Sequence, residues 1–233
     1  MPIFRLTDDL IFPPPELAGP EGLLAVGGDL KPERLLLAYK NGIFPWYSED
    51  DPILWWSPDP RLLLYPDDLR ISRSLAKTLR KGKFQVTFDT DFKSVIEACA
   101  ETRGKNRDAT WITDEMMDAY IRLHEMGYAH SVETWHDHIL VGGLYGVSLG
   151  RAFFGESMFS AMSDASKVAL VYLRDLLQRK RFDFIDCQMS TDHLLRLGAQ
   201  KVEREKFLVQ LGRSMKYASL IGRWNPDYSI PKT

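Results

Sequence analysis

The sequence contains few cysteines, no long apolar run and little net charge. Cys99 and Cys187 are the only cysteines among 233 residues, and they fit neither a metal-site spacing nor a disulfide framework, so we expect a reducing, cytoplasmic compartment. No apolar run approaches the length that spans a bilayer, and the first residues lack the basic and apolar regions of a secretory signal. These absences predict a soluble protein without a membrane partner.

Histidines are also few, and the five present form no convincing metal-binding set. His136 and His138 lie close together in the sequence, but a hairpin turn explains them better than zinc binding does. We therefore expect neither a metal nor a cofactor.

A net charge of −2 excludes a protein that is basic over its whole surface, but it allows a local basic patch. Residues 70–83 include six basic residues and no acidic one, and the first four recur at three- and four-residue spacing. On a helix these four would form one basic face. A solvated surface helix is one explanation, but the absence of acids favours an anionic partner such as a phosphate backbone. The candidate phosphate-binding residues are Arg73, Lys77, Arg80, Lys81 and Lys83.

Residues 1–62 differ in composition from the rest, since they hold most of the prolines and three of the six tryptophans. We interpret them as a small, turn-rich N-terminal domain. One helix is predicted there, beginning at Pro32 and stopping at Asn41-Gly42. The aromatic residues of the irregular segments 42–47 and 53–60 form either a small core or an exposed surface on which bases stack.

Residues 63–233 show the pattern of an α/β domain. Strands are expected at 84–88, 128–135, 139–147, 151–159 and 182–187. Helices are expected near Phe92, after a Thr113 cap, after a cap at Ser163 or Asp164, and over 193–197 after a Thr191 cap. Short connections make the three middle strands antiparallel neighbours. This order is that of an acetyltransferase-like (GNAT) domain, so the predicted fold class is α/β (α+β), with a mixed, largely antiparallel sheet.

Two carboxyl groups fall inside predicted strands, Glu156 in the strand 151–159 and Asp186 in the strand 182–187. The intervening helix makes a strand–helix–strand unit, which places the two groups near the same end of neighbouring strands. Buried carboxylates need partners or a function. Two satisfied ion pairs and an active site are both compatible with this pattern.

Seven short blocks of sequence follow one another in a distinctive order. They are GGDL at 27–30, GIFPW at 42–46, WWSPDPR at 55–61, TWIT at 110–113, VGGLYG at 141–146, GESMFS at 155–160 and DCQ at 186–188. Together they closely resemble the bacterial leucyl/phenylalanyl-tRNA–protein transferases. The resemblance implies an aminoacyltransferase that moves Leu or Phe, and Met less well, from aminoacyl-tRNA to the N-terminal Arg or Lys of a protein. The product would be degraded through the N-degron pathway.

The resemblance also implies roles for individual residues. Asp186 and Gln188 match a catalytic pair described as drawing a proton from the incoming amine. Because an amide has no usable pKa near neutrality, we assign Gln188 to orient the amine through its carbonyl oxygen, and Asp186 to polarise Gln188 and to receive charge. Glu156 would bind the charged N-terminus of the acceptor.

The donor would be held by aromatic and apolar residues. Trp46 and Trp111 match positions that hold the terminal adenosine of the tRNA. The residues implied to line the pocket for the aminoacyl side chain are Leu144, Phe153, Met158, Leu170, Leu173 and Ile185. Little further catalytic apparatus is needed, because the ester is already activated and alignment of the reactants lowers the barrier.

Two other functions share parts of this pattern. An acetyl-CoA-dependent N-acetyltransferase would have the same fold, but it needs a glycine-rich loop for the pyrophosphate, and residues 159–165 contain no glycine and carry Asp164. A non-catalytic RNA-binding module would leave Glu156 and Asp186 as unexplained costs near a polyanion. We expect the transferase to act as a monomer.

Overall fold

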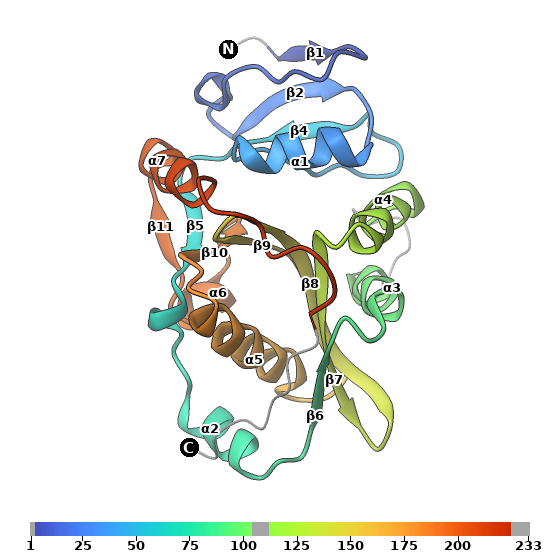
Figure 1. Ribbon diagram of the computed structural model, residues 1–233, viewed down its shortest axis with the longest axis vertical. Coiled ribbons are helices and arrows are strands. Elements are labelled where there is room, and N and C mark those ends of the chain that lie inside the picture. Colours follow the sequence, from blue (N-terminus) through green and yellow to red (C-terminus); the bar gives the residue numbers. More distant parts are fainter. Residues whose placement is uncertain (1–2, 104–111, 225–233) are drawn as a thin grey trace.

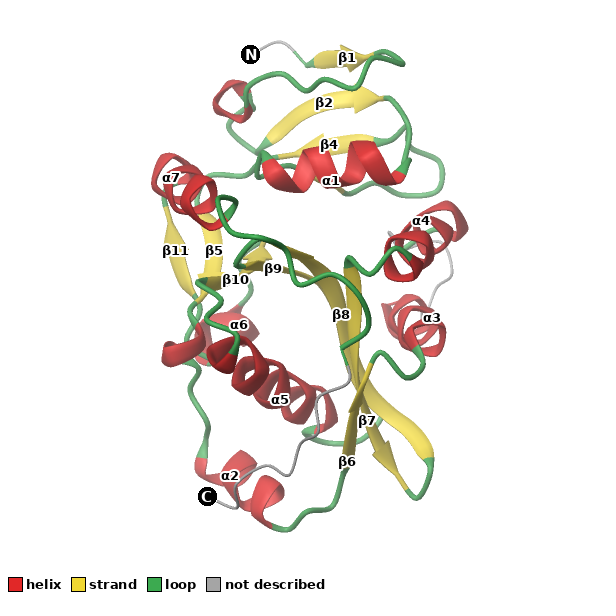
Figure 2. Ribbon diagram, viewed as in Figure 1, coloured by secondary structure: helices red, strands yellow, loops and turns green. Residues whose placement is uncertain are grey.

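The computed structural model describes residues 3–103 and 112–224. The described chain forms a small sheet near the N-terminus and a large sheet that carries most of the remaining elements (Figures 1 and 2). Trp111, one of the two residues predicted to hold the adenosine, lies outside these ranges.

The small sheet contains the strands in the order β1-β2-β4-β3, with β1 and β2 parallel. Its elements are β1 (Phe4–Leu6), the 3-10 helix η1 (Pro15–Leu17), β2 (Leu23–Gly27), α1 (Pro32–Lys40), β3 (Phe44–Pro45) and β4 (Leu54–Trp56). The predicted helix at Pro32 is confirmed, and Gly42, with φ +71°, follows its end. The backbone of 42–47 and 53–60 is more regular than predicted, because β3 and β4 pair there.

The large sheet has the order β11-β5-β10-β9-β8-β7-β6. Its strands are β5 (Arg61–Leu64), β6 (Gln85–Phe88), β7 (Ala129–His136), β8 (Ile139–Leu149), β9 (Ala152–Ser160), β10 (Phe184–Gln188) and β11 (Gln200–Val202). Strands β9 and β10 run parallel, and the other neighbours among the described strands are antiparallel. The predicted mixed, largely antiparallel sheet is confirmed, as is the order of its middle strands.

Helices cover both faces of the large sheet (Figure 1). They are η2 (Pro66–Asp68), α2 (Arg73–Arg80), α3 (Phe92–Arg103), α4 (Asp114–Glu125), α5 (Ala165–Arg179), α6 (Asp192–Arg196) and α7 (Arg204–Ser214). Successive strand residues point to opposite faces, so Phe153 belongs to the core under α5 whereas Phe154 belongs to the core under α1, α3 and α4. The ring of Tyr39, on α1, packs 5.0 Å from that of Phe154, so α1 closes the large sheet as well as the small one.

Side-chain caps were predicted at three helix starts. Thr113 accepts a hydrogen bond from the backbone of Met116, and Thr191 caps α6 in the same way, so two predictions are confirmed. Asp164 occupies the cap position of α5, but its side chain makes no capping bond. Its carboxylate instead accepts from Lys167 at 2.9 Å and from Thr78 of α2 at 3.1 Å. The predicted cap is therefore wrong, and Asp164 joins α2 to α5.

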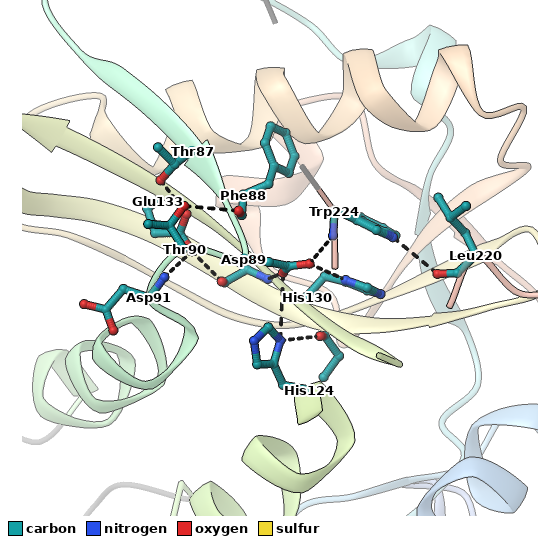
Figure 3. Close-up of polar contacts among 12 residues, drawn as sticks. Thr87, Phe88, Asp89, Thr90, Asp91, His124, His130, Glu133, Leu220 and Trp224 are labelled. Atoms are coloured by element: carbon teal, nitrogen blue, oxygen red, sulfur yellow. Dashed lines mark hydrogen bonds and ion pairs between the residues drawn. The ribbon is translucent and has the colours of Figure 1, made fainter. Parts of the chain in front are cut away.

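A buried polar cluster, which includes Asp89 and His130, holds Trp224 against the large sheet (Figure 3). The imidazole of His130 stacks on the Trp224 ring with centroids 3.8 Å apart. One oxygen of Asp89 lies 2.8 Å from Nδ1 of His130 and accepts from the backbone N–H of Trp224 at 2.6 Å. This cluster could not be predicted, because His130 lies on β7, Asp89 follows β6, and Trp224 is far from both in the sequence.

Burial lowers the pKa of His130 below its usual 6.5, with His124 adding to this effect and Asp89 opposing it. The folded protein therefore favours neutral His130. The contribution of this neutral form to the free energy of unfolding is complete above pH 6.5 and is lost as the pH falls below 6.5. We expect urea unfolding to show a larger loss of free energy between about pH 8 and pH 5.5 in the wild type than in His130→Gln. His138→Asn, at the exposed hairpin turn, is the control and should behave as the wild type. Equal pH dependence in wild type and His130→Gln would contradict this role.

Candidate active site

A cavity of about 510 Å³ lies beside strands β9 and β10 and helices α5 and α6. All six apolar residues predicted to form a pocket line it, namely Leu144, Phe153, Met158, Leu170, Leu173 and Ile185. Trp46, Glu156 and Gln188 also line it, so residues from both sheets surround one space. Asp186, by contrast, is completely buried and lies behind this wall.

Two irregularities of strand pairing bring the polar residues together. Along β8 and β9 the register pairs Tyr145 with Ser157 and Gly146 with Gly155, so Glu156 is an extra, bulged residue. A second shift between β10 and β5 leaves Cys187 as the extra residue, and Gln188 then adopts φ +60°. Bulges redirect side chains, and these two occur on neighbouring parallel strands. As a result Nε2 of Gln188 donates to Oε1 of Glu156 at 2.7 Å.

Glu156 is held by three donors from three elements. Besides Gln188 of β10, Tyr39 of α1 donates to Oε1 at 2.8 Å and Tyr120 of α4 donates to Oε2 at 3.1 Å. The pKa of Glu156 is raised to about 7, chiefly by burial, with the charge of Asp186 adding to this effect and the three donors opposing it. Glu156 can therefore gain or lose a proton near neutral pH.

Asp186 is neutralised by Arg61, the first residue of β5. Nε and one terminal nitrogen of Arg61 donate to the two oxygens of Asp186 at 2.8 and 2.7 Å, and both side chains are fully buried. The guanidinium lies 4.7 Å from the ring centroids of Phe44 and Phe207. This bidentate ion pair has the strong geometry of arginine–carboxylate recognition.

The contacts of Gln188 differ from the predicted ones. We expected Asp186 to polarise the side chain of Gln188, but Asp186 accepts from the backbone N–H of Gln188 at 2.9 Å, and the side-chain amide faces Glu156. The bulge at Cys187 causes the difference, because it turns Gln188 toward β9. Asp186 thus fixes the backbone from which Gln188 reaches the cavity.

Trp46 lines the cavity, whereas the residues of the basic segment do not. The Trp46 side chain is 37% exposed at the cavity, where its ring packs edge-on against Trp56. The five predicted phosphate-binding residues are all exposed, on α2 or directly after it. Because α2 is joined to the start of α5 and α5 carries Leu170 and Leu173 of the cavity wall, the basic surface and the cavity are connected through one helix.

Three residues of the site were not predicted. Tyr39 and Tyr120 read as apolar positions on amphipathic helices, and nothing in their spacing indicates a hydroxyl directed at a carboxylate. The sequence around Arg61 indicates its role only weakly: Arg61 is followed by three leucines, and together the four residues form a fully buried strand. A charge at the start of such a strand requires a buried partner.

The described residues contain no group of three His, Cys, Asp or Glu side chains arranged as a metal site. None of the helices in residues 3–103 and 112–224 combines the length and the apolar character needed to cross a membrane.

Asp186→Asn is expected to lower the free energy of unfolding by about 3–5 kcal/mol, because it leaves a buried Arg61 without its counter-charge. Replacing Arg61 and Asp186 together with Leu should recover most of this loss. Lys206→Ala, which breaks an exposed pair with Glu203, is the control and should cost less than about 1 kcal/mol. Urea unfolding measures all three. An Asp186→Asn protein as stable as the Lys206→Ala control would show that the buried pair does not hold the site together.

Comparison with known proteins identifies the family. The family model described as leucyl/phenylalanyl-tRNA protein transferase matches residues 63–212, and the model of its N-terminal domain matches residues 28–59. A leucyl/phenylalanyl-tRNA–protein transferase of Syntrophobacter fumaroxidans is 61% identical over 215 residues, which cover 92% of each chain. One of Anaeromyxobacter sp. (strain Fw109-5) is 56% identical over 227 residues, 97% of each chain.

Solved structures show a more distant likeness. L-PGS from Bacillus licheniformis is 9% identical with a TM-score of 0.42, over 72% of this chain and 53% of that one. A GCN5-related N-acetyltransferase from Kribbella flavida is 12% identical with a TM-score of 0.38, over 74% of this chain and 61% of that one. The sequence matches, which are far stronger, decide the assignment. The chain belongs to the leucyl/phenylalanyl-tRNA–protein transferase family and is an enzyme of that class.

Proposed function

We propose that the protein transfers Leu or Phe, and Met less well, from aminoacyl-tRNA to the N-terminal Arg or Lys of a protein. The observation that carries this proposal is an apolar cavity of about 510 Å³ whose wall includes the hydrogen-bonded pair Glu156 and Gln188. An apolar aminoacyl side chain fits the apolar lining, and its ester would lie beside the polar pair. The new peptide bond would mark the acceptor for the N-degron pathway.

The donor would enter with its terminal adenosine against Trp46. This ring is partly exposed at the cavity, as stacking on a base requires. In the proposal Trp111 supplies the second aromatic surface. The phosphates of the acceptor stem would lie on the exposed basic residues of α2, from which α5 leads back to the cavity.

The acceptor amine would lie between Gln188 and Glu156. Nε2 of Gln188 donates to Glu156, so the side-chain carbonyl oxygen of Gln188 is the atom that can accept a hydrogen bond from the amine and align the amine with the ester. Glu156, with its pKa near 7, supplies a counter-charge for a positively charged N-terminus. Asp186 acts from behind the wall by fixing the backbone of Gln188.

An acetyl-CoA-dependent reaction suits this site less well. The pyrophosphate of CoA would need the start of α5, where Asp164 places a carboxylate bonded to Lys167 and Thr78. A module that only binds RNA would have no use for a buried carboxyl group with a raised pKa facing a cavity.

The proposal includes an organisation into two domains, residues 1–62 and 63–233, in a cytoplasmic monomer. The change from the small sheet to the large one supports a division between Trp56 and Arg61, slightly before residue 62, because β5 already belongs to the large sheet. Residues of both domains line the cavity, so neither domain would form the complete cavity without the other.

Transfer of radiolabelled Leu and Phe from tRNA to a peptide beginning with Arg tests the proposed function. We expect transfer of both amino acids, no acetylation from acetyl-CoA, and at least about tenfold less transfer of β-branched Ile and Val, which are too wide near Cβ for a narrow apolar pocket. A peptide beginning with Asp is the matched acceptor control. Acetyl transfer, or tRNA binding without aminoacyl transfer, would overturn the proposal.

The basic surface has its own test. Replacing Lys77, Arg80 and Lys81 with Ala should raise KM for aminoacyl-tRNA and reduce the slope of log affinity against log salt by about 2 to 3, because three phosphate contacts are lost. Transfer from aminoacyl-adenosine should be unchanged. A matched variant with Lys201, Lys206 and Arg213 replaced by Ala removes the same charge near α7 and should retain the wild-type KM. Equal losses with both donors would contradict phosphate binding by α2.

A further inference from the structure

Glu156 belongs to a closed ring of polar contacts with two tyrosines. Tyr39 contacts Oε1 at 2.8 Å, Tyr120 contacts Oε2 at 3.1 Å, and the two phenol oxygens are hydrogen-bonded to each other. The members come from α1, α4 and β9, and all three are buried. Three oxygen–oxygen contacts therefore form a closed ring among buried side chains.

The number of protons in the ring depends on the charge of Glu156. Each hydrogen bond needs one hydrogen, and the two phenols supply two, whereas an ionised carboxylate supplies none. One of the three contacts would then join two oxygens without a hydrogen between them. A protonated Glu156 supplies the third hydrogen and completes the ring.

Gln188 decides where that hydrogen sits. Oε1 of Glu156 already accepts from Nε2 of Gln188 and from Tyr39, so its lone pairs are in use. The added proton therefore belongs on Oε2, from which it points to Tyr120. Tyr120 then donates to Tyr39, and Tyr39 keeps its bond to Oε1. All three contacts are satisfied in one direction around the ring.

Glu156 is the ring member that connects with the cavity. It lines the cavity wall, whereas Tyr39 and Tyr120 are completely buried behind it. A proton released in the cavity can thus enter the ring through Glu156, and the tyrosines stabilise it without touching the substrate.

We propose that Glu156 is the proton acceptor of the transfer reaction and that Tyr39 and Tyr120 are positioning residues that hold the accepted proton by completing this ring. The proposal rests on the proposed function. It assigns the proton to the carboxyl group of Glu156, because the amide of Gln188 cannot accept a proton near neutral pH.

The reaction balances with this assignment. The neutral amine nitrogen attacks the ester carbonyl carbon, a carbon–nitrogen bond forms, and the bond from that carbon to the ribose oxygen breaks. The nitrogen loses one proton, which Glu156 takes on Oε2. The leaving ribose oxygen gains one proton, which Glu156 returns, so the ring is restored after each transfer.

The charges around the ring agree with this role. Glu156 faces Tyr39, Tyr120, Gln188 and the Arg61-paired Asp186, and burial is the main cause that brings its pKa to about 7. Burial also raises the pKa of Tyr39 and Tyr120 well above 10, with the charge of Glu156 adding to it and Tyr145 acting on Tyr120. The phenols keep their hydrogens at neutral pH, and Glu156 is the group of the ring that titrates there.

The first test is a ¹³C NMR titration of the protein with labelled glutamate carboxyl groups, in which Glu156→Gln identifies the signal. We expect Glu156 to titrate near pH 7 in the wild type. Each hydroxyl also donates to the ionised carboxylate and so favours that form. Tyr39→Phe and Tyr120→Phe should nevertheless each lower this midpoint, because the ionised form loses one ring bond and the protonated form loses two. Tyr65→Phe, which removes a hydroxyl bonded to Gln210, is the matched control and should leave it unchanged.

A wild-type midpoint near the ordinary 4.5 would overturn the proposal. A higher midpoint in both tyrosine variants would also overturn it, since hydroxyls that only solvate the anion would have that effect. This titration needs no substrate, so its outcome is independent of the proposed function.

The second test measures single-turnover transfer to an Arg-peptide at saturating donor and acceptor across pH 6 to about 9. Glu156→Gln should lower the rate on the order of 10²-fold and remove the limb near pH 7, leaving the titration of the amine itself near pH 8. The same profile in Glu156→Gln and the wild type would overturn proton acceptance by Glu156. No transfer by the wild type would instead overturn the proposed function.

Discussion

Asp186 has its charge buried in the middle of the large sheet, where Arg61 of the neighbouring strand balances it. The pair is held between Phe44, which follows α1, and Phe207 of α7, so it joins the small sheet, the large sheet and the C-terminal helix. A buried ion pair contributes little net stability, but loss of either partner is costly. This constraint fixes the end of β10 and, with it, the backbone of Gln188.

From that fixed point, the site is assembled by departures from regular structure. The bulges at Glu156 and Cys187 turn side chains of two parallel strands toward each other. Helix α1 then brings Tyr39 from the N-terminal part of the chain to the same carboxylate that Tyr120 reaches from α4. The apolar cavity lies on one side of this group and the tyrosines on the other. In the proposed reaction, Glu156 alone would separate the substrate in the cavity from the tyrosines that hold the proton.

Much of the fold could be predicted because its signals are local. The helix at Pro32, the caps at Thr113 and Thr191, and the three antiparallel strands follow from periodicity and turn residues within short windows. Juxtaposition of Glu156 and Asp186 followed from the strand–helix–strand unit. Matching sequence blocks led to the residues around the cavity, although apolar residues alone would have read as ordinary core.

The remaining features depend on contacts between distant parts of the chain. Whether Tyr39 is core or a hydrogen-bond donor depends on α1 docking against β9, which no periodicity encodes. The four-residue strand β5 is too short and too uniformly apolar to distinguish from other buried segments. The bulge at Cys187 decided which carboxylate Gln188 meets, and a one-residue shift of register is invisible in the sequence.

The most direct test of the site is a crystal structure of the protein with phenylalanyl-adenosine in which an amide replaces the reactive ester. We expect the phenyl ring inside the cavity against Leu170 and Ile185, the adenine against Trp46, and the carbonyl carbon facing Gln188 and Glu156. An aminoacyl group bound elsewhere, with this cavity left empty, would contradict the assignment of the active site.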